Sequence, residues 1–320
     1  MMETTTREIS GYATRIVTSG PSEAAASRTP LTLPSPQRGE GIAGTLPSPQ
    51  RGEGVTGTPP TPQQGEGVIG APPAPQRREG VATVLWLHDT LGNRWTPGHE
   101  ALSAHVRLIA PSLPGFDDST KLRGIDGPED VVFWLLDLLD ALALDRPLLL
   151  GCGLGGWMAA EFAARYPERL GGLVLVNASG LQIDGALIED EFALPRPMLR
   201  PLVFCDPNGP LAQEWLPDTE PTERVEAALH AQVAAARLAW QFPYSKKLRG
   251  RLPRARVPAL ILWGENDRLV PLAHAQAYAA GLPSARLTLL PDAAHYPYLE
   301  APAQFADEVV ELASAYQLAP

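Results

Sequence analysis

Apolar and polar positions along most of the chain follow a pattern of short strands separated by helices. Six runs after residue 80 are almost continuously apolar, which is typical of strands buried on both faces of a parallel sheet. They are VATVLWLH (81–88), VRLIAP (106–111), PLLLGC (147–152), LGGLVLVNA (170–178), PALILWG (258–264) and ARLTLLP (285–291). Helical spacing occurs at 128–144, 154–165, 273–280 and 302–316, and an earlier strand is expected at 12–19. This alternation predicts an α/β fold with a doubly wound, mostly parallel sheet.

The stretch from 180 to 255 breaks the alternation. It has no convincing strand, a helical section around 223–240 and several aromatic side chains. An insertion of this kind after a central strand predicts a helical cap over the strand ends, with Trp215, Trp240 and Phe242 lining a pocket beneath it. The alternative is that these aromatic residues only attach the cap to the core.

Residues 32–82 consist of four tandem copies with a period of 13, the first of which reads TLPSPQRGEGIAG. The copies are rich in Pro, Gly and charge and bury too little apolar surface to offset the entropy of ordering. We therefore expect a disordered insert. Its PxxP spacing fits a proline-rich ligand, but near-identical copies favour a harmless insertion. The predicted organisation is N-terminal strands of the core (1–20), the insert (21–80), the first part of the core (81–179), the cap (180–255) and the second part of the core (256–320).

The charge balance limits the choice of partner. A net charge of −10, from 26 basic and 36 acidic residues, argues against nucleic acid or an anionic membrane, because phosphate binding requires clustered lysines and arginines. The first ten residues lack the apolar core of a signal peptide, and Asp137 and Asp140 interrupt the most apolar helix. We expect a cytoplasmic protein with a small-molecule substrate or ligand, and no pattern indicates an oligomeric state.

The two cysteines and the candidate ligands predict no redox or metal chemistry. Cys152 and Cys205 cannot form a disulfide framework, so we expect buried, reduced thiols. Potential metal ligands do not occur at metal-binding spacing, and no motif indicates a cofactor. Neither a metal nor a cofactor is therefore expected.

Five stretches place chemistry-bearing residues after predicted strands. They are LWLHDTLG (85–92), IAPSLPGFDDS (109–119), GCGLGG (151–156), WGENDRLVP (263–271) and DAAHYPYLEAP (292–302). In this order they resemble the α/β-hydrolase fold family, and the resemblance covers nearly all of the chain outside the repeat. GCGLGG stands where that family has its G-x-S-x-G nucleophile elbow, and the last two stretches stand where it has its acid and its histidine. The resemblance implies the α/β-hydrolase fold and a hydrolytic activity.

The resemblance also implies roles for individual residues. Asp267 matches the acid and His295 the base of a triad in which histidine takes the proton of a serine and the carboxylate fixes the histidine tautomer. The oxyanion donors would be the backbone N–H groups of Thr90 and Leu154. The nucleophile position matches Gly153, which has no side chain to attack a carbonyl carbon. Covalent serine catalysis is therefore excluded.

Four other residues bear on this site. Asp89 replaces the glycine that the family has after His88, and Ser112 and Asp117 replace the usual Asp and Gly around the PGF stretch. A carboxylate at position 89 would oppose the negative charge that develops in an oxyanion site. Cys152 lies one residue before the elbow apex, at the end of a strand, so we expect it to be buried filler and not a reactive thiol.

Two functions compete on this basis. The first is a hydrolase of small, mostly apolar, ester-like substrates, in which His295 and Asp267 act on water as a general-base pair. The second is a catalytically inactive pseudohydrolase that serves as a small-molecule or partner-binding module. A lyase or cofactor-free oxygenase is a weaker third alternative, suggested by the wider family but by no particular residue. The retained acid and histidine favour the first.

Overall fold

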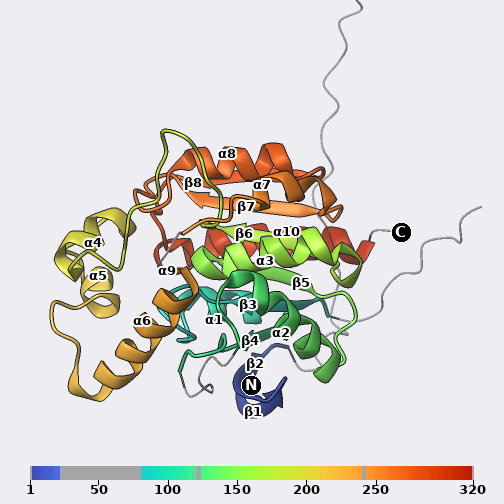
Figure 1. Cartoon of the computed structure of the whole chain (residues 1–320), viewed down its shortest axis with the longest axis horizontal. Helices are drawn as coiled ribbons and strands as arrows, with labels where there is room; N and C mark the ends of the chain where they lie inside the picture. Colours follow the sequence, from blue (N-terminus) through green and yellow to red (C-terminus); the bar gives the residue numbers. More distant parts are fainter. Residues whose placement is uncertain (1, 22–80, 118, 120–123, 240–242, 319–320) are drawn as a thin grey trace, which may run out of the picture.

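The structure is a computed structural model that describes residues 2–21, 81–117, 119, 124–239 and 243–318. Its described strands form one eight-stranded sheet in the order β1-β2-β4-β3-β5-β6-β7-β8. The strands are β1 (Glu3–Ile9), β2 (Tyr12–Ser19), β3 (Thr83–Leu87), β4 (Arg107–Pro111), β5 (Leu148–Cys152), β6 (Gly172–Val176), β7 (Ala259–Gly264) and β8 (Ala285–Leu290). β2 pairs antiparallel with β1 and β4, and the remaining pairs are parallel. The predicted doubly wound, mostly parallel sheet is confirmed (Figure 1).

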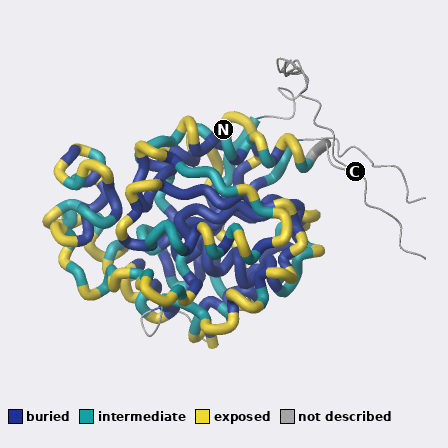
Figure 2. Tube along the Cα trace, turned by 90° about the horizontal axis from the view of Figure 1, so that it is seen from above, coloured by how far each residue is buried: buried dark blue, intermediate teal, exposed yellow. Residues whose placement is uncertain are grey.

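The central strands form the core of the molecule. Every residue of β5, β6 and β7 is buried, which agrees with their continuous apolar runs because both faces of the sheet are covered. Figure 2 shows this buried trace through the middle of the molecule, with exposed residues around it. β1 has no apolar run of its own and is held by its pairing with β2, with Ile9 as its buried residue.

Helices pack against the sheet in two groups. In the first group, α1, α9 and α10 contact one another, and α10 contacts β6 and β7. In the second group, α3 lies on β5 and β6 and is contacted by α2 and α7. α8 lies on β7 and β8. Their bounds are α1 (Pro97–Ser103), α2 (Pro128–Ala141), α3 (Gly153–Arg165), α7 (Leu248–Arg251), α8 (Leu272–Gly281), α9 (Pro297–Glu300) and α10 (Pro302–Leu318), with short 3-10 turns η1 (Pro167–Arg169) and η3 (Leu252–Arg254). α2 ends before 144, because Ala143 has a left-handed φ of 49° that an α-helix cannot continue.

Between β6 and β7 the described residues form helices and no strand. Besides α7 and η3, which contact α3, these are α4 (Arg196–Val203), α5 (Pro210–Trp215), η2 (Thr222–Arg224) and α6 (Val225–Ala239), which lie beyond one side of the sheet at the left of Figure 1. α6 agrees with the helical section expected around 223–240. Trp240, Phe242 and the repeat at 22–80 lie outside the described residues.

One prediction about the cysteines is wrong. Cys152 is a buried free thiol as expected, but Cys205 is exposed. It follows the end of α4, where its backbone N–H donates to Oε1 of Glu300 at 2.8 Å and leaves its side chain at the surface. Among the described helices, none combines the length and the apolar character needed to span a membrane.

Candidate active site

The turn between β5 and α3 forms the centre of the site. Gly153 stands at its apex with a φ of 49°, in the left-handed region that favours glycine. The turn packs tightly on the strand beside it, since a Cβ on Gly155 would meet the carbonyl oxygen of His88 at 2.4 Å. A Cβ on Gly153 would lie 3.3 Å from Nε2 of His295 and 3.0 Å from Cβ of Asp89. The apex therefore faces the imidazole directly.

The predicted acid and histidine meet across this turn. Nδ1–H of His295 donates to Oδ2 of Asp267 at 2.8 Å, and both side chains are buried. The other carboxylate oxygen, Oδ1, accepts from the backbone N–H groups of Leu269 at 2.9 Å and Val270 at 3.0 Å. These donors fix the carboxylate, and the carboxylate fixes the imidazole with Nε2 directed at Gly153.

Asn177, which the sequence analysis did not identify, completes the support of the acid. It is fully buried after β6; its Nδ2 donates to Oδ2 of Asp267 at 2.6 Å and to the carbonyl of Ala294 at 3.3 Å. Its Oδ1 accepts from the backbone N–H of Gly264 at 3.1 Å. One signal was available in the sequence: a polar residue directly after a buried apolar strand, at the sheet edge where such sites form.

α4 is bonded to both loops that carry the pair. The carbonyl of Val203 accepts from the backbone N–H of His295 at 3.1 Å, and the carbonyl of Leu202 accepts from that of Arg268 at 3.0 Å. The last carbonyls of a helix have no donor within the helix, so these two bonds satisfy them. The position of α4 is thereby coupled to the positions of the loops that carry Asp267 and His295.

The charges around His295 favour its protonated form. Burial alone lowers the pKa of His295, but attraction and hydrogen bonding to Asp267, with further attraction to Asp89 and Glu191, raise that pKa above 6.5 overall. Burial raises the pKa of Glu191, against the effect of a hydrogen bond from Oγ1 of Thr90 at 2.7 Å. These neighbouring carboxyl groups therefore stabilise the imidazolium form of His295 relative to a free imidazole.

The loop after β3 holds Asp89 beside the elbow. Nδ1–H of His88 donates to the carbonyl of Asp89 at 2.7 Å, and Nε2 of His88 accepts from the backbone N–H of Leu113 at 2.9 Å. Burial lowers the pKa of His88, so this imidazole is neutral. The Asp89 carboxylate accepts from the backbone N–H of Leu91 at 2.8 Å through Oδ1 and from the hydroxyl of Tyr298 through Oδ2. The buried carboxylate of Asp89 therefore lies next to Gly153, as its position in the sequence motif suggested.

A cavity of about 190 Å³ opens onto this group of residues. Its wall includes Gly153 and His295 together with Thr90 and Leu154, the two residues predicted to supply backbone donors. Leu154 lies in the first turn of α3, where backbone N–H groups have no acceptor within the helix. Within the described part of the chain, no group of three or more His, Cys, Asp or Glu residues could hold a metal ion.

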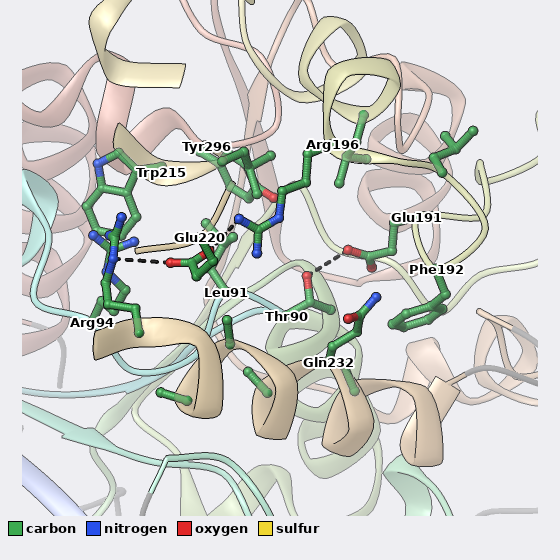
Figure 3. Close-up of a pocket in the computed structure, with 18 of the residues that line it drawn as sticks. Thr90, Leu91, Arg94, Glu191, Phe192, Arg196, Trp215, Glu220, Gln232 and Tyr296 are labelled. Atoms are coloured by element: carbon green, nitrogen blue, oxygen red, sulfur yellow. Dashed lines mark hydrogen bonds and ion pairs between the residues drawn. The ribbon is translucent and has the colours of Figure 1, made fainter. Parts of the chain in front are cut away.

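A second cavity, of about 290 Å³, adjoins the first. The two share Thr90, Glu191 and Phe192 in their walls. Trp215, predicted to line a pocket, is buried in the wall of this larger cavity (Figure 3). Tyr296, directly after His295, lines this cavity as well.

Three arginines that the sequence analysis did not connect also line the larger cavity. Arg94 comes from the loop after β3, Arg196 from the start of α4 and Arg224 from the turn before α6. No local spacing links positions so far apart, so only the fold brings them together. The net charge of −10 gives no indication of this group of arginines.

Fold and site together define an α/β protein with a buried Asp–His pair at the carboxyl edge of a mostly parallel sheet, facing a tight strand-to-helix turn. The model of the Alpha/beta hydrolase family matches residues 47–308, and the chain belongs to that family.

Curated relatives and solved structures agree with this assignment. The chain is 30% identical over 226 residues to the dihydrolipoyllysine-residue acetyltransferase component of an acetoin cleaving system from Pseudomonas putida, covering 68% of this chain and 59% of the relative. It is 27% identical over 217 residues to a 2-hydroxy-6-oxo-6-phenylhexa-2,4-dienoate hydrolase from Burkholderia cepacia, covering 61% and 72%. A bacterial membrane phospholipase A shares the fold, with a TM-score of 0.70 at 18% identity, covering 99% of this chain and 87% of that one.

Proposed function

We propose that this chain is a hydrolase of small ester-like substrates in which His295 acts as general base on a water molecule. In this proposal, Gly153 occupies the position at which the family carries its nucleophilic serine. The observation that supports it most strongly is the geometry of the imidazole: Nδ1 is bonded to Asp267 at 2.8 Å, and Nε2 lies 3.3 Å from the point where a side chain would begin at Gly153. The base is positioned for a nucleophile that the chain itself does not supply.

The proposed reaction is one displacement by water. Nε2 of His295 takes a proton from water as its oxygen bonds to the carbonyl carbon, and the resulting imidazolium is stabilised by Asp267. The carbonyl oxygen gains the negative charge and accepts hydrogen bonds from the backbone N–H groups of Thr90 and Leu154. When the intermediate collapses, the carbon–oxygen bond to the leaving group breaks and the imidazolium returns the proton to the departing alkoxide. The products are a carboxylic acid and an alcohol.

Without a serine the expected turnover is slow. In triad hydrolases, loss of the serine costs about 10⁶-fold, while the oxyanion donors and binding retain on the order of 10³- to 10⁴-fold over water. A residual rate of that order is the level expected for this chain. The relative from Burkholderia cepacia is named as the hydrolase of a compound with an oxo group, which supports a carbonyl-containing substrate for this chain.

The inactive binding module is the second candidate, and Asp89 is the observation that favours it. Its buried carboxylate lies beside the apex of the turn, with Cβ 3.0 Å from a Cβ built on Gly153. Negative charge at this point raises the energy of an oxyanion formed next to it. If this effect exceeds the contribution of the backbone donors, the chain binds ligands in the two cavities without turning them over.

Hydrolysis of short 4-nitrophenyl esters by the full chain tests the proposal. We expect a slow rate without a burst that falls at least tenfold in His295→Ala and in Asp267→Asn, because each removes part of the general-base pair. His105→Ala, which truncates an exposed histidine, is the matched control and is expected to keep the full rate. Equal rates in wild type and His295→Ala would reject the general-base mechanism, and a stable covalent adduct with a fluorophosphonate probe would reject the absence of a protein nucleophile.

A further inference from the structure

The larger cavity has a cationic end. Glu220 forms ion pairs with both Arg196 and Arg224, the latter at 3.1 Å. Two guanidinium groups thus share a single carboxylate. Arg94 lies on the same wall, and Figure 3 shows it beside Trp215 and Glu220, with Thr90 and Glu191 farther along the pocket.

Arg94 is the one of these three guanidinium groups that lies outside the ion pairs with Glu220. Among the described residues it forms no ion pair; its guanidinium carbon lies 3.8 Å from the centre of the Trp215 ring, in a cation–π contact. Burial and repulsion from Arg224 lower the pKa of Arg94, and these effects exceed the attraction to Glu214 and Glu220. A half-buried arginine in this state is stabilised by an anion, because arginine stays charged and needs acceptors for its five N–H groups.

The remainder of this cavity is suited to an apolar body. Its walls carry Leu91, Leu194, Leu199 and Ala231, and Figure 3 shows Leu91 between Arg94 and Thr90. The shared residues Thr90, Glu191 and Phe192 form part of the wall beside His295. A ligand anchored at the arginine end therefore extends toward the imidazole along an apolar surface.

We propose that Arg94 is the anchor of a binding subsite for the carboxylate of an amphipathic small molecule, with the apolar part of that molecule lying along the larger cavity. A carboxylate fits better than a phosphate dianion, because one guanidinium outside the ion pairs matches one negative charge and the planar fork of arginine matches the two oxygens of a carboxylate. Trp215 holds the guanidinium plane in place for this contact.

This subsite does not depend on turnover at His295, and it also sharpens the proposed function. If the chain hydrolyses esters, a preferred substrate carries a free carboxylate at the end remote from the bond that is cleaved. If the chain does not hydrolyse anything, the same carboxylate is expected to bind. A binding measurement therefore separates a failure of the subsite from a failure of the hydrolytic mechanism.

The test is calorimetric binding of 4-phenylbutyrate and of its neutral analogue 4-phenylbutyramide to the full chain. We expect wild type to bind the carboxylate on the order of tenfold more tightly than the amide, as a charge-assisted pair predicts. In Arg94→Gln, which keeps a hydrogen-bonding side chain of similar length, this preference is expected to fall to within twofold, with the amide affinity unchanged. Arg94→Lys is expected to retain part of the preference.

Arg237→Gln is the matched control, because Arg237 is exposed on α6 and does not line the larger cavity. We expect it to bind both probes as wild type does. The proposal is overturned if wild type binds the two probes equally, if neither binds, or if the preference for the carboxylate survives in Arg94→Gln. Tighter binding of 4-phenylbutyl phosphate than of 4-phenylbutyrate would assign the subsite to phosphates and would overturn the carboxylate proposal.

Discussion

Oδ2 of Asp267 accepts hydrogen bonds from two side chains at once, Nδ1–H of His295 at 2.8 Å and Nδ2–H of Asn177 at 2.6 Å. The acid is therefore positioned from two strands, since Asn177 follows β6 and Asp267 follows β7. Asn177 lines neither of the two cavities, and none of its hydrogen bonds is to the imidazole of His295. It is a positioning residue for the acid.

Replacing Asn177 by alanine is expected to lower kcat by about 10- to 100-fold, the usual effect of losing a hydrogen bond to a charged group. KM is expected to stay within twofold, because Asn177 does not line either cavity. Steady-state kinetics with a 4-nitrophenyl ester measures both. Asn266→Ala removes an exposed side-chain hydrogen bond to Pro291 and is the control. An Asn177→Ala variant with unchanged kcat, or with a loss confined to KM, would contradict this role.

The pH dependence of activity follows from the raised pKa of His295. A general base must be neutral, so kcat/KM is expected to rise with pH through an inflection above 6.5. Asp89→Asn removes one of the charges that raise this pKa and is expected to move the inflection to lower pH. Asp184→Asn, at an exposed position, is expected to leave it in place. An inflection in Asp89→Asn that stays in place or moves upward would show that Asp89 does not act on the imidazole.

The free energy of unfolding is expected to change over the same pH range. Because the pKa of His295 is higher in the folded chain than its ordinary value of 6.5, the folded state binds the proton more tightly than the unfolded state. The resulting stabilisation is fully present below pH 6.5 and is lost as pH rises through the folded-state pKa. Urea unfolding of wild type and His295→Ala over this range measures it as a difference that shrinks with increasing pH.

The strands of the core were predictable because burial on both faces requires continuous apolar runs. β1 and α4 were not. β1 carries six polar residues before its only buried one, Ile9, and depends on pairing with β2. α4 contains Pro201 inside the helix, which local propensity disfavours, and its end is stabilised by bonds from the backbone N–H groups of Arg268 and His295.

Some residues of the candidate site were also predictable from the sequence, and others were not. Asp267 and His295 were predictable because each lies in a motif directly after a strand. Arg94 and Arg224 were not, because they are 130 positions apart (224 − 94) and no local pattern connects them. Their meeting depends on how the segment between β6 and β7 lies over the loop after β3. That arrangement is a property of tertiary packing alone.

The tight packing of the elbow predicts a contrast between two glycines. A Cβ on Gly155 would meet the carbonyl oxygens of His88 at 2.4 Å and Leu87 at 2.5 Å, and backbone atoms cannot move aside as a flexible side chain can. Gly155→Ala is expected to lower the free energy of unfolding by about 2–3 kcal/mol or more. Gly250→Ala, in α7 with nothing within 4 Å of the new Cβ, is expected to be neutral or to stabilise by up to about 1 kcal/mol. Urea denaturation of both variants measures the contrast, and equal effects would contradict it.

Gly153→Ser tests whether the rest of the catalytic framework is intact. A serine Cβ at this position lies 3.3 Å from Nε2 of His295 before any adjustment, so its hydroxyl comes within reach of the base. We expect an increase in esterase kcat/KM of at least about tenfold and labelling by a fluorophosphonate probe, both absent in Gly153→Ser/His295→Ala. The left-handed φ of 49° is expected to cost about 1–2 kcal/mol of stability, with Cβ of Asp89, 3.0 Å away, adding strain.

Gly250→Ser introduces the same hydroxyl at an open position and is the control for non-specific labelling. A folded Gly153→Ser that is neither labelled nor more active would show that the Asp–His pair does not activate a nucleophile at this turn. Adding Asp89→Gly to that variant then separates two causes. A gain in activity on this second change would identify the Asp89 carboxylate as the inhibiting group, whereas no gain would favour the binding module over the hydrolase.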